Sequence, residues 1–378
     1  MIKKIRLLQV IPSMGIGGAE TGCKYLGDYV AKRSEFSAIL TSGGSQLNFL
    51  SKDVRIFKRS LSKNIFTILF NIFYIYKIIK QNNINIVHAR RRAPAWSCYF
   101  ACKLSKTKFV TTFHGTYNFN SSLKKFYNSI MIKSDLVIAG SNFIEKHIKS
   151  NYVFKNSLQV IKRGIDTSYF DSATISQNEK DNLRKQVGFS NKNFLVLLPG
   201  RLTEWKGQSI FIEAANYLKK NNQLSNIFFI ILGGSKGKEK YQKRLNDLVY
   251  SYKLVDKVRF LNSTNNMPLS YAFVNLVVST SVEPEAFGRV SVEAQAMQKP
   301  VLASDLGGSK ETIINKKTGW LIEPGNSEQL AKKILDISKM DNSILLSIGF
   351  QGRENVLENY TKDQMCLKTL EIYESLVY

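Results

Sequence analysis

The sequence predicts an α/β protein with two doubly wound parallel-sheet domains that face each other across a cleft. The chain has 378 residues, a length that suits two domains. Short apolar strands alternate with helical segments in both halves, as they do in parallel sheets. A polar, unpatterned stretch at residues 171–180 separates the two series, and we place the interdomain linker there.

The first half opens with a strand at Ile5–Ile11, followed by the glycine-rich segment Pro12–Gly22 and a helical pattern. Gly17 and Gly18 let backbone amides approach an anion at a helix N-terminus, and a simple tight turn is the alternative. The segment is not the dinucleotide-binding fingerprint, because the third spaced glycine is missing.

The rest of the first half continues this alternation. A short strand at Ala38–Thr41 precedes apolar residues at helical spacing over Asn64–Lys80, whose most apolar run is too short to span a bilayer. A further helix is expected to begin near Pro94, and Ser141 is an expected helix cap. The remaining strands are expected at Ile84–His88, Lys108–Phe113, Asp135–Ala139 and Gln159–Ile161.

Basic side chains and a histidine follow two of these strands. Arg90, Arg91 and Arg92 come after Ile84–His88, where they can hold an acidic acceptor group, and a solvated loop is the alternative. His114 follows the next strand, and a purely structural histidine is the alternative reading. Ligands of open parallel sheets bind outside the carboxyl ends of the strands, so we expect these residues beside one cleft.

The second half repeats the pattern. Arg201 and Lys206 flank the turn after its first strand and Gly207 opens the next helix, an arrangement suited to a diphosphate. Gly233 ends the second strand at the same expected edge. The six expected strands are Phe194–Leu198, Ile227–Leu232, Val258–Leu261, Asn275–Ser279, Pro300–Ser304 and Trp320–Ile322.

Two carboxylates, Glu285 and Glu293, lie eight residues apart after the fourth of these strands. Phe287 and Gly288 stand between them, followed by a helical run at Arg289–Gln298. Eight residues is just over two helical turns, so a helix beginning near Gly288 prevents the acids from forming a close catalytic pair. We expect them to touch different parts of one elongated ligand, and a solvated helix with two surface glutamates is the alternative.

The charge of the chain indicates its class of partner, and its cysteine content indicates its cellular compartment. The net charge is +25, and residues 1–190 hold 30 Lys+Arg against 10 Asp+Glu, whereas residues 191–378 hold 24 against 19. A basic first half suits a polyanionic partner such as a phospholipid surface, a phosphorylated acceptor or nucleic acid, and biased composition is the alternative. Four scattered cysteines suit a reducing cytoplasm, and no signal peptide is visible.

The segment Leu123–Lys133 mixes lysines with aromatic and aliphatic residues. This basic amphipathic pattern is typical of a helix at a membrane surface. An ordinary helix with one face in the core is the alternative. No nucleic-acid-binding module is recognised, so we expect no nucleic-acid partner.

Taken together, these motifs resemble the retaining glycosyltransferases of family 4, which have the GT-B fold of two Rossmann-like domains. The segments EAFGRVSVEAQAMQKPVLASDLGG and TGWLIEPGN resemble the family's signature region, in which two glutamates enclose seven residues. PGRLTEWKG resembles its phosphate-binding stretch, MGIGGAE its N-terminal glycine loop, and RGIDTSYF the segment before the linker. VHARRRAPAWS and TTFHGTY are less specific and are similar to a bacterial envelope-glycan subgroup. The resemblance covers nearly the whole chain.

The resemblance implies how the donor is held by the second domain. Glu285 would bind hydroxyls of the donor sugar, with the amides of Phe287 and Gly288 beside it. Glu293 would hold the ribose diol of the nucleotide. Gly233 would belong to the same donor-binding set.

The resemblance also implies roles for the remaining candidates. Arg201 and Lys206 would neutralise the diphosphate as it leaves, and His114 would lie near the transferred sugar. Gly17 and Gly18 would lie against the phosphates or the acceptor. Fixed cations stabilise a leaving group without a metal, and the chain has no Asp-x-Asp motif, so we expect no metal and no other cofactor.

The expected domains follow from this likeness: an acceptor-binding domain over residues 1–172, a nucleotide-sugar-binding domain over 181–360, and a closing helix over 361–378 that packs back on the first domain. The expected activity is the retaining transfer of a hexose-type sugar from a UDP- or GDP-linked donor to a glycan or lipid-linked acceptor. We expect a role in lipopolysaccharide or other cell-envelope polysaccharide synthesis.

The expected location is the cytoplasm, peripheral on the inner face of the cytoplasmic membrane, with the basic first domain on the anionic lipid surface. The first alternative is another enzyme of similar fold, such as a nucleotide-sugar epimerase or a phosphorylase. The others are a catalytically weak partner subunit and a basic nucleic-acid-binding protein. The complete set of Arg201, Lys206, Glu285 and Glu293 argues against the inactive subunit.

Overall fold

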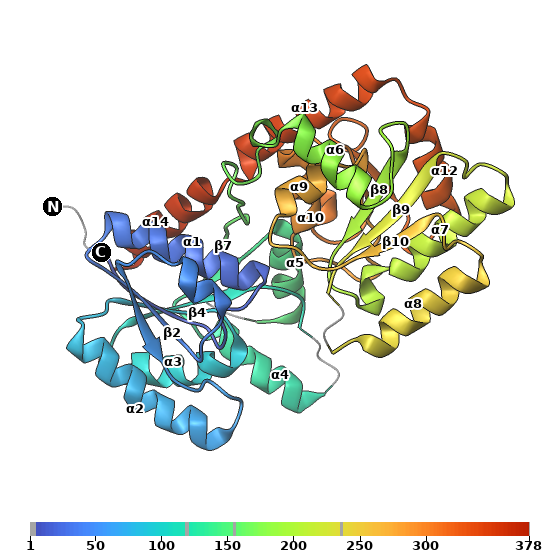
Figure 1. Cartoon of the computed structure of the whole chain (residues 1–378). Coiled ribbons are helices and arrows are strands. Elements are labelled where there is room, and N and C mark those ends of the chain that lie inside the picture. The colour runs from blue at the N-terminus through green and yellow to red at the C-terminus, as the bar shows by residue number, and fades with distance from the viewer. Residues whose placement is uncertain (1–4, 118–120, 154–155, 235–236, 378) are drawn as a thin grey trace. The chain divides into compact units, whose positions relative to one another are not determined.

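The computed structural model describes residues 5–117, 121–153, 156–234 and 237–377. The chain divides into two compact units (Figure 1): unit 1 comprises Met1–Gly164 and Thr361–Tyr378, and unit 2 comprises Ile165–Tyr360. No helix within these described ranges is long and apolar enough to cross a membrane.

The linker expected at residues 171–180 is wrong. Helix α6 (Gln177–Gln186) begins inside that stretch, and Ser176 and Glu179 cap each other's backbone at its start. The chain instead passes from unit 1 to unit 2 after Gly164, and the expected first domain over residues 1–172 is longer than unit 1's first segment.

Unit 1 is built on a parallel sheet with the described strand order β3-β2-β1-β4-β5-β6-β7. The strands are β1 (Arg6–Val10), β2 (Phe36–Thr41), β3 (Val54–Lys58), β4 (Ile86–Ala89), β5 (Lys108–Phe113), β6 (Leu136–Ala139) and β7 (Ser157–Val160). The helices are α1 (Gly18–Arg33), η1 (Ser45–Phe49), α2 (Ile65–Gln81), α3 (Arg92–Ser105), α4 (Ser122–Ser129), η2 (Ile130–Ile132), α5 (Asn142–Asn151) and α14 (Lys362–Val377).

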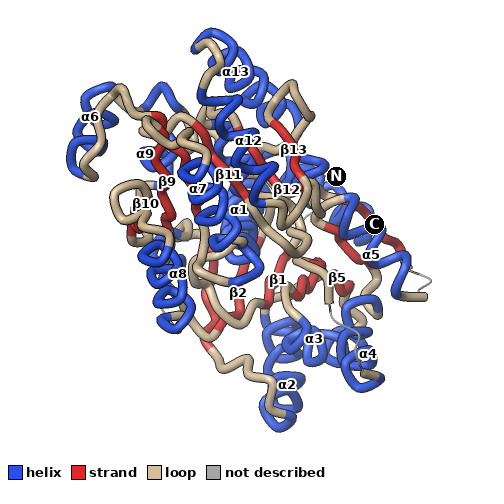
Figure 2. Tube along the Cα trace, turned by 90° about the vertical axis from the view of Figure 1, so that its right-hand side faces the viewer, coloured by secondary structure: helices blue, strands red, loops and turns tan. Residues whose placement is uncertain are grey.

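Unit 2 is built on a second parallel sheet with the described order β10-β9-β8-β11-β12-β13. The strands are β8 (Phe194–Pro199), β9 (Ile227–Leu232), β10 (Val258–Leu261), β11 (Leu276–Ser279), β12 (Val301–Ser304) and β13 (Trp320–Ile322). Besides α6, the helices are η3 (Ser172–Thr174), η4 (Glu204–Lys206), α7 (Gln208–Lys220), α8 (Glu239–Ser251), α9 (Met267–Ala272), α10 (Arg289–Ala296), α11 (Ser309–Thr312), α12 (Ser327–Ser338) and α13 (Asn342–Asn359). Figure 2 shows the helices of each unit interleaved with its strands. The predicted pair of parallel α/β domains is confirmed.

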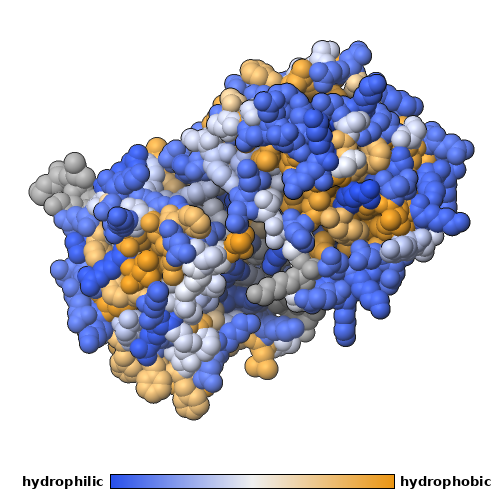
Figure 3. Space-filling view, viewed as in Figure 1, coloured by the Kyte–Doolittle hydropathy of each residue, from blue (hydrophilic) through white to orange (hydrophobic). Residues whose placement is uncertain are grey.

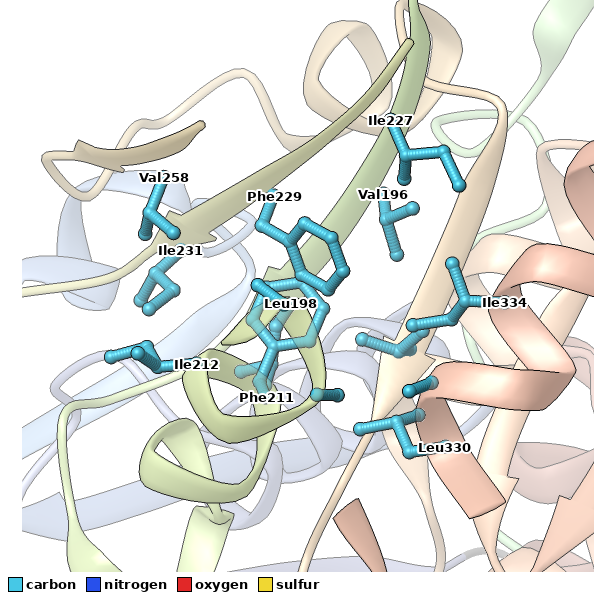
Figure 4. Packing of buried hydrophobic residues seen from close by; sticks show 14 of the residues in the cluster. Val196, Leu198, Phe211, Ile212, Ile227, Phe229, Ile231, Val258, Leu330 and Ile334 are labelled. Atoms are coloured by element: carbon cyan, nitrogen blue, oxygen red, sulfur yellow. The ribbon is translucent and has the colours of Figure 1, made fainter. Parts of the chain in front are cut away.

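Successive residues of the central strands of unit 2 pack on opposite faces of its sheet. Val196 and Leu198 of β8 belong to one buried cluster, and Leu195 and Leu197 belong to the other. Figure 4 shows the first cluster, in which strand residues such as Phe229 meet side chains from α7 and α12. Because helices cover both faces, these strands are apolar throughout rather than alternating with polar residues.

The closing helix α14 packs on unit 1, as expected. Its buried residues share a core with the first strand and first helix of the chain, including Leu7 and Leu26. The α14 residues in that core are Met365, Cys366, Leu370 and Tyr373. The last segment of the chain is therefore part of the N-terminal fold, although it follows unit 2 in sequence.

A buried histidine joins α14 to the sheet. The Tyr373 hydroxyl is hydrogen-bonded to Nδ1 of His88 (2.5 Å), and Thr112 Oγ1 is bonded to its Nε2 (2.6 Å). Burial, together with the nearby Arg90 and Arg163 guanidinium groups, lowers the pKa of His88 well below 6.5. The imidazole is therefore neutral in the folded protein at neutral pH.

We expect His88 to make the protein less stable in mild acid. Below about pH 6.5 the unfolded chain protonates this histidine while the folded chain does not. The free energy of unfolding therefore decreases as the pH is lowered, by up to about 1.4 kcal/mol per pH unit. Thermal melts of the wild type and His88→Gln between pH 7.5 and 5.5 measure the effect. The variant should lose part of the acid slope, and equal slopes would exclude this role.

Candidate active site

Each sheet has one point at which the order of strands reverses. In unit 1 the chain extends the sheet from β1 toward β3 and then restarts on the other side with β4, and in unit 2 the same change occurs between β8 and β11. The loops that follow such a pair of strands diverge, and ligands of doubly wound sheets bind there. Most of the predicted site residues lie in these four loops.

An ion pair between Lys206 and Glu285 bridges the reversal point of unit 2. Lys206 Nζ lies 2.7 Å from Glu285 Oε1, and the two side chains are 14% and 10% exposed. The same oxygen accepts hydrogen bonds from Ser281 Oγ (2.6 Å) and Ser279 Oγ (3.2 Å). The other oxygen, Oε2, has no hydrogen-bond donor among the residues that the structure describes.

The pKa of Glu285 is lowered in this setting. Burial alone would raise it, but the Lys206 ammonium and the hydrogen bonds from Lys206, Ser281 and Ser279 together outweigh burial. Glu285 is therefore a carboxylate at neutral pH. A buried anion with one oxygen fixed and one open is well suited to accept hydrogen bonds from sugar hydroxyl groups.

Backbone contacts hold the two loops of unit 2 together. Gly207, which follows Lys206, has a left-handed backbone (φ 70°), and a Cβ atom there would lie 2.0 Å from the Thr280 carbonyl oxygen. Thr280 Oγ1 donates to the carbonyl oxygens of Lys206 and Gly207, both at 3.0 Å, and Val282 N donates to Trp205 O at 2.8 Å. Only glycine fits this crossing, which sets Lys206 against Glu285.

Arg201 lies on the same loop as Lys206 and is exposed. Among the described acidic side chains, none forms an ion pair with it. Its carbonyl oxygen accepts a hydrogen bond from Gln208 Nε2 (3.0 Å), which fixes the turn that leads into α7. An exposed guanidinium in the loop that leads into a helix is a suitable partner for phosphate oxygens.

Three other predicted donor residues belong to the framework of this loop region. Phe287 is 9% exposed and its ring packs edge-on against Tyr360 (5.6 Å). Gly288 precedes α10 with a left-handed backbone. Gly233 lies so close to Gly200 that a Cβ atom would be 1.9 Å from the Gly200 carbonyl oxygen. Contacts of their backbone amides with a donor stay a prediction.

Glu293 lies in α10, which begins after Gly288 as the sequence predicts. The side chain is buried, with Oε2 accepting from the Tyr271 hydroxyl (2.8 Å) and Oε1 from Arg289 Nε. Burial and then the charge of Glu293 raise the pKa of Tyr271 well above 10. Both carboxylate oxygens already have donors, so a ribose diol would have to replace at least one of them, and Arg289 is the more exposed.

The reversal point of unit 1 is also bridged by an ion pair. Gly17 and Gly18 begin α1 after β1, and Glu20 in the first turn of that helix pairs with Arg91 Nη2 at 2.8 Å. Arg91 belongs to the loop after β4. The glycine loop and the arginine loop are therefore joined, and a ligand role for the glycines stays a prediction.

The three consecutive arginines of unit 1 point to different partners. Arg90 is 5% exposed and donates from Nε to Gln9 Oε1 (3.0 Å). Arg92 donates to Asn128 Oδ1 (2.6 Å) and lies over the Tyr117 ring (4.3 Å). The structure thus does not bring the three guanidinium groups together around one ligand, and their role toward an acceptor stays a prediction.

His114 follows β5 and has an unusual environment. Both ring nitrogens are shielded from solvent, and neither has a hydrogen-bond partner among the described residues. A buried polar group without a partner costs about 1–3 kcal/mol, so a ligand hydroxyl that bonds this imidazole would recover that free energy.

Sequence reasoning missed Ser279, Ser281 and Tyr271. The hydroxyl run at the end of β11 was an available signal for the two serines, because side chains at that edge face a ligand. Tyr271 had no local signal, since it meets Glu293 across 22 residues of sequence.

Comparison with known proteins places the whole chain in one family. Residues 16–169 match the model "Glycosyltransferase Family 4", and residues 179–353 match the model "Glycosyl transferases group 1". The chain is similar to a crystal structure of a glycosyltransferase from Rickettsia africae ESF-5, with 35% identity, 99% of each chain covered and a TM-score of 0.90.

Two further relatives have informative names. The Escherichia coli UDP-Gal:alpha-D-GlcNAc-diphosphoundecaprenol alpha-1,3-galactosyltransferase is 24% identical, over 91% of this chain and 89% of the relative. The Anabaena protein HepE, solved in complex with UDP and glucose, is 22% identical, with 98% of this chain and 100% of that chain covered and a TM-score of 0.84. The chain therefore belongs to the glycosyltransferases of family 4 and has the GT-B fold.

Proposed function

We propose that this protein is a retaining, metal-independent hexosyltransferase that moves a sugar from a UDP- or GDP-linked donor to a glycan or lipid-linked acceptor. Its proposed role is the synthesis of lipopolysaccharide or another cell-envelope polysaccharide, on the inner face of the cytoplasmic membrane. The observation that carries the proposal is the buried pair of Lys206 and Glu285 at the reversal point of unit 2. A fixed cation and a buried carboxylate lie side by side there, and this supports a role in holding a sugar next to its leaving diphosphate.

The chemistry of glycosyl transfer fits this pair. Breaking the bond between sugar and diphosphate builds negative charge on the leaving phosphate and positive charge on the sugar. Lys206 and the exposed Arg201 would stabilise the phosphate more in the transition state than in the ground state. Glu285 would hold and orient the sugar without forming a covalent bond. Retention would follow from attack on the face the phosphate leaves, with that phosphate taking the acceptor proton.

The relatives leave the donor base open. The Escherichia coli relative is named for UDP-Gal, whereas a Mycobacterium tuberculosis relative is named as a GDP-mannose-dependent mannosyltransferase. The lipid-linked acceptor in the name of the first supports the acceptor class proposed here.

A binding panel tests the donor assignment. Calorimetric titration with UDP, GDP and ADP, in buffer with EDTA, should show preference for one diphosphate. Binding should persist in EDTA, because neither Lys206 nor Glu293 needs a metal to bind it. Glu293→Ala should weaken that nucleotide about tenfold or more, since a charge-assisted hydrogen bond to a ribose hydroxyl is lost.

Glu328→Ala is the matched control, because Glu328 is an exposed carboxylate of unit 2 whose partners are the surface residue Lys332 and the Tyr217 hydroxyl (3.1 Å). It should leave nucleotide affinity unchanged. A folded wild-type protein that binds no nucleoside diphosphate would contradict the proposed transferase, and binding that requires Mg²⁺ would contradict metal independence.

A further inference from the structure

Helix α2 of unit 1 exposes large apolar side chains that no described part of unit 1 covers. Its other side faces the core, where Ile72, Ile75 and Ile78 are at most 8% exposed. The five uncovered side chains lie at helical spacing on the outer side, with exposures of 60% for Ile65, 67% for Phe66, 49% for Leu69, 66% for Phe70 and 69% for Phe73. The outer face of a surface helix is ordinarily polar. A contiguous apolar patch of this kind marks an interaction site.

The patch continues over two neighbouring helices. Ser97 Oγ of α3 donates to Ile68 O of α2 (2.9 Å), and Trp96 of α3 contacts the ring of Phe126 in α4 (5.3 Å). Figures 1 and 2 both show α2, α3 and α4 together, and Figure 3 shows apolar atoms along this edge of unit 1. The further exposed side chains are Phe100 and Leu104 of α3 and Leu123 and Phe126 of α4. We call this surface the α2–α3–α4 face.

The charge around this face is of one sign. The sequences of α2, α3 and α4 contain lysine and arginine but no aspartate or glutamate. The basic character of the chain is also concentrated in unit 1, which holds 29 Lys+Arg against 9 Asp+Glu, whereas unit 2 holds 25 against 20. Exposed lysines lie at the ends of the helices, among them Lys77, Lys80, Lys103, Lys124 and Lys125.

A basic cavity adjoins the face at the end of α3. Its volume is about 250 Å³, and its lining includes one carboxylate, Asp135, which accepts a hydrogen bond from Phe109 N (2.7 Å). The aromatic ring of Tyr99 also lines the cavity and contacts the ring of Phe100 on the face (5.3 Å). The basic lining residues are Lys103, Lys106, Lys108 and Lys133. Four lysines around such a space suit a phosphate group.

We propose that the α2–α3–α4 face docks unit 1 on a bilayer that contains anionic phospholipid. The apolar side chains enter the boundary between headgroups and acyl chains, the surrounding lysines meet the negative surface, and the basic cavity holds a headgroup phosphate. A soluble polyanion would leave the apolar side chains in water. A second copy of the chain would bring two basic units together, and like charges oppose that contact.

This inference deepens the proposed function and rests on the membrane location given there, although the face and the cavity include no residue of the donor site. It also changes the interpretation of the segment Leu123–Lys133. That segment forms α4 and η2 and contributes Leu123 and Phe126 to the face, while α2 supplies most of its apolar area.

Vesicle flotation of the full chain tests the proposal. The wild type should bind vesicles of phosphatidylglycerol and phosphatidylcholine more tightly than vesicles of phosphatidylcholine alone. Replacing Phe66, Phe70 and Phe73 together by serine should weaken binding at least about 100-fold, since three phenyl rings no longer leave water.

Part of the wild-type binding should survive high salt, because apolar burial is not screened. Phe350→Ser is the matched control: Phe350 is 57% exposed on α13 of unit 2, and its loss should have no effect.

Site-specific labelling shows which side chains enter the lipid. The native cysteines are buried, and burial raises the pKa of Cys23 and Cys366 to about 12, so an added surface cysteine reacts selectively. An environment-sensitive fluorophore on Phe70→Cys should shift to the blue with the anionic vesicles, whereas the same label on Phe350→Cys should not. This single-site variant also carries the test if the triple variant does not fold.

Three results would overturn the proposal: no binding of the wild type to anionic vesicles, a fluorophore at position 70 that stays in water, or concentration-dependent self-association that the triple substitution abolishes. Calorimetric titration with UDP and GDP keeps the two proposals apart. The triple variant should bind nucleotide like the wild type, and a wild type that binds vesicles but no nucleotide would contradict the transferase assignment alone.

Discussion

Replacing Lys206 by methionine should lower the rate of sugar transfer by about a thousandfold. The ammonium group lies beside Glu285 at the reversal point of unit 2, where the leaving diphosphate is expected to gain charge. Loss of one preorganised group that stabilises such charge typically costs about 10²–10³ in kcat. Because the stabilisation grows toward the transition state, kcat should fall more than donor affinity. Steady-state kinetics with a sugar donor of the nucleotide that the binding panel identifies measures both.

The same substitution also leaves Glu285 without its counter-ion. Burial then acts on the carboxylate with less opposition, so its pKa should rise, and breaking a buried pair from one side costs about 3–5 kcal/mol of stability. The double variant Lys206→Met/Glu285→Gln separates the two effects, because it removes the uncompensated charge. It should recover stability but not activity. Lys310→Met, which breaks an exposed pair with Asp305 (3.4 Å), is the control and should change neither. Transfer restored in the double variant would refute the role given to Lys206.

The fold could be predicted where strands are buried on both faces. The limits of β9 (Ile227–Leu232) and β13 (Trp320–Ile322) match the apolar runs in the sequence, because helices cover both sides of these strands. The edge strand β3 (Val54–Lys58) was not predicted, since it is largely exposed and carries charged residues. The predicted linker at residues 171–180 overlaps helix α6 for a related reason. The helix has no buried residue and thus no apolar periodicity, and its capping pair was the local signal that was missed.

The site could be located from the sequence but its contacts could not. Glycines and charges after strands indicate an edge, and the order of strands brings those loops together. Which partner each side chain selects depends on that order: Lys206 and Glu285 are 79 residues apart, and Arg90 turns away from Arg91 to reach Gln9 on a neighbouring strand. No spacing rule along the chain encodes such pairs. The same limit explains why three adjacent arginines were expected to act together.

The single substitution Gly207→Ala should both destabilise unit 2 and slow sugar transfer. The added Cβ would lie 2.0 Å from the Thr280 carbonyl oxygen, a distance that no side-chain rotation relieves, so the loop after β8 must move away from the loop after β11. We expect a loss of about 3 kcal/mol, from the left-handed backbone and the displaced contacts together. Lys206 precedes Gly207 directly, so the shift also separates the ammonium from Glu285. Urea unfolding and donor-saturated turnover measure the two effects.

Gly325→Ala isolates the contribution of backbone conformation. Gly325 has nearly the same dihedral (φ 79°), but nothing lies within 4 Å of the position its Cβ would take. The control should lose only about 1 kcal/mol, the cost of a left-handed non-glycine residue, and keep full activity. Equal losses in the two variants would mean that the loop yields to the added methyl group. In that case the contact between Gly207 and Thr280 would not set the position of Lys206, and the ion pair would have to be held by its own charge and the two serines.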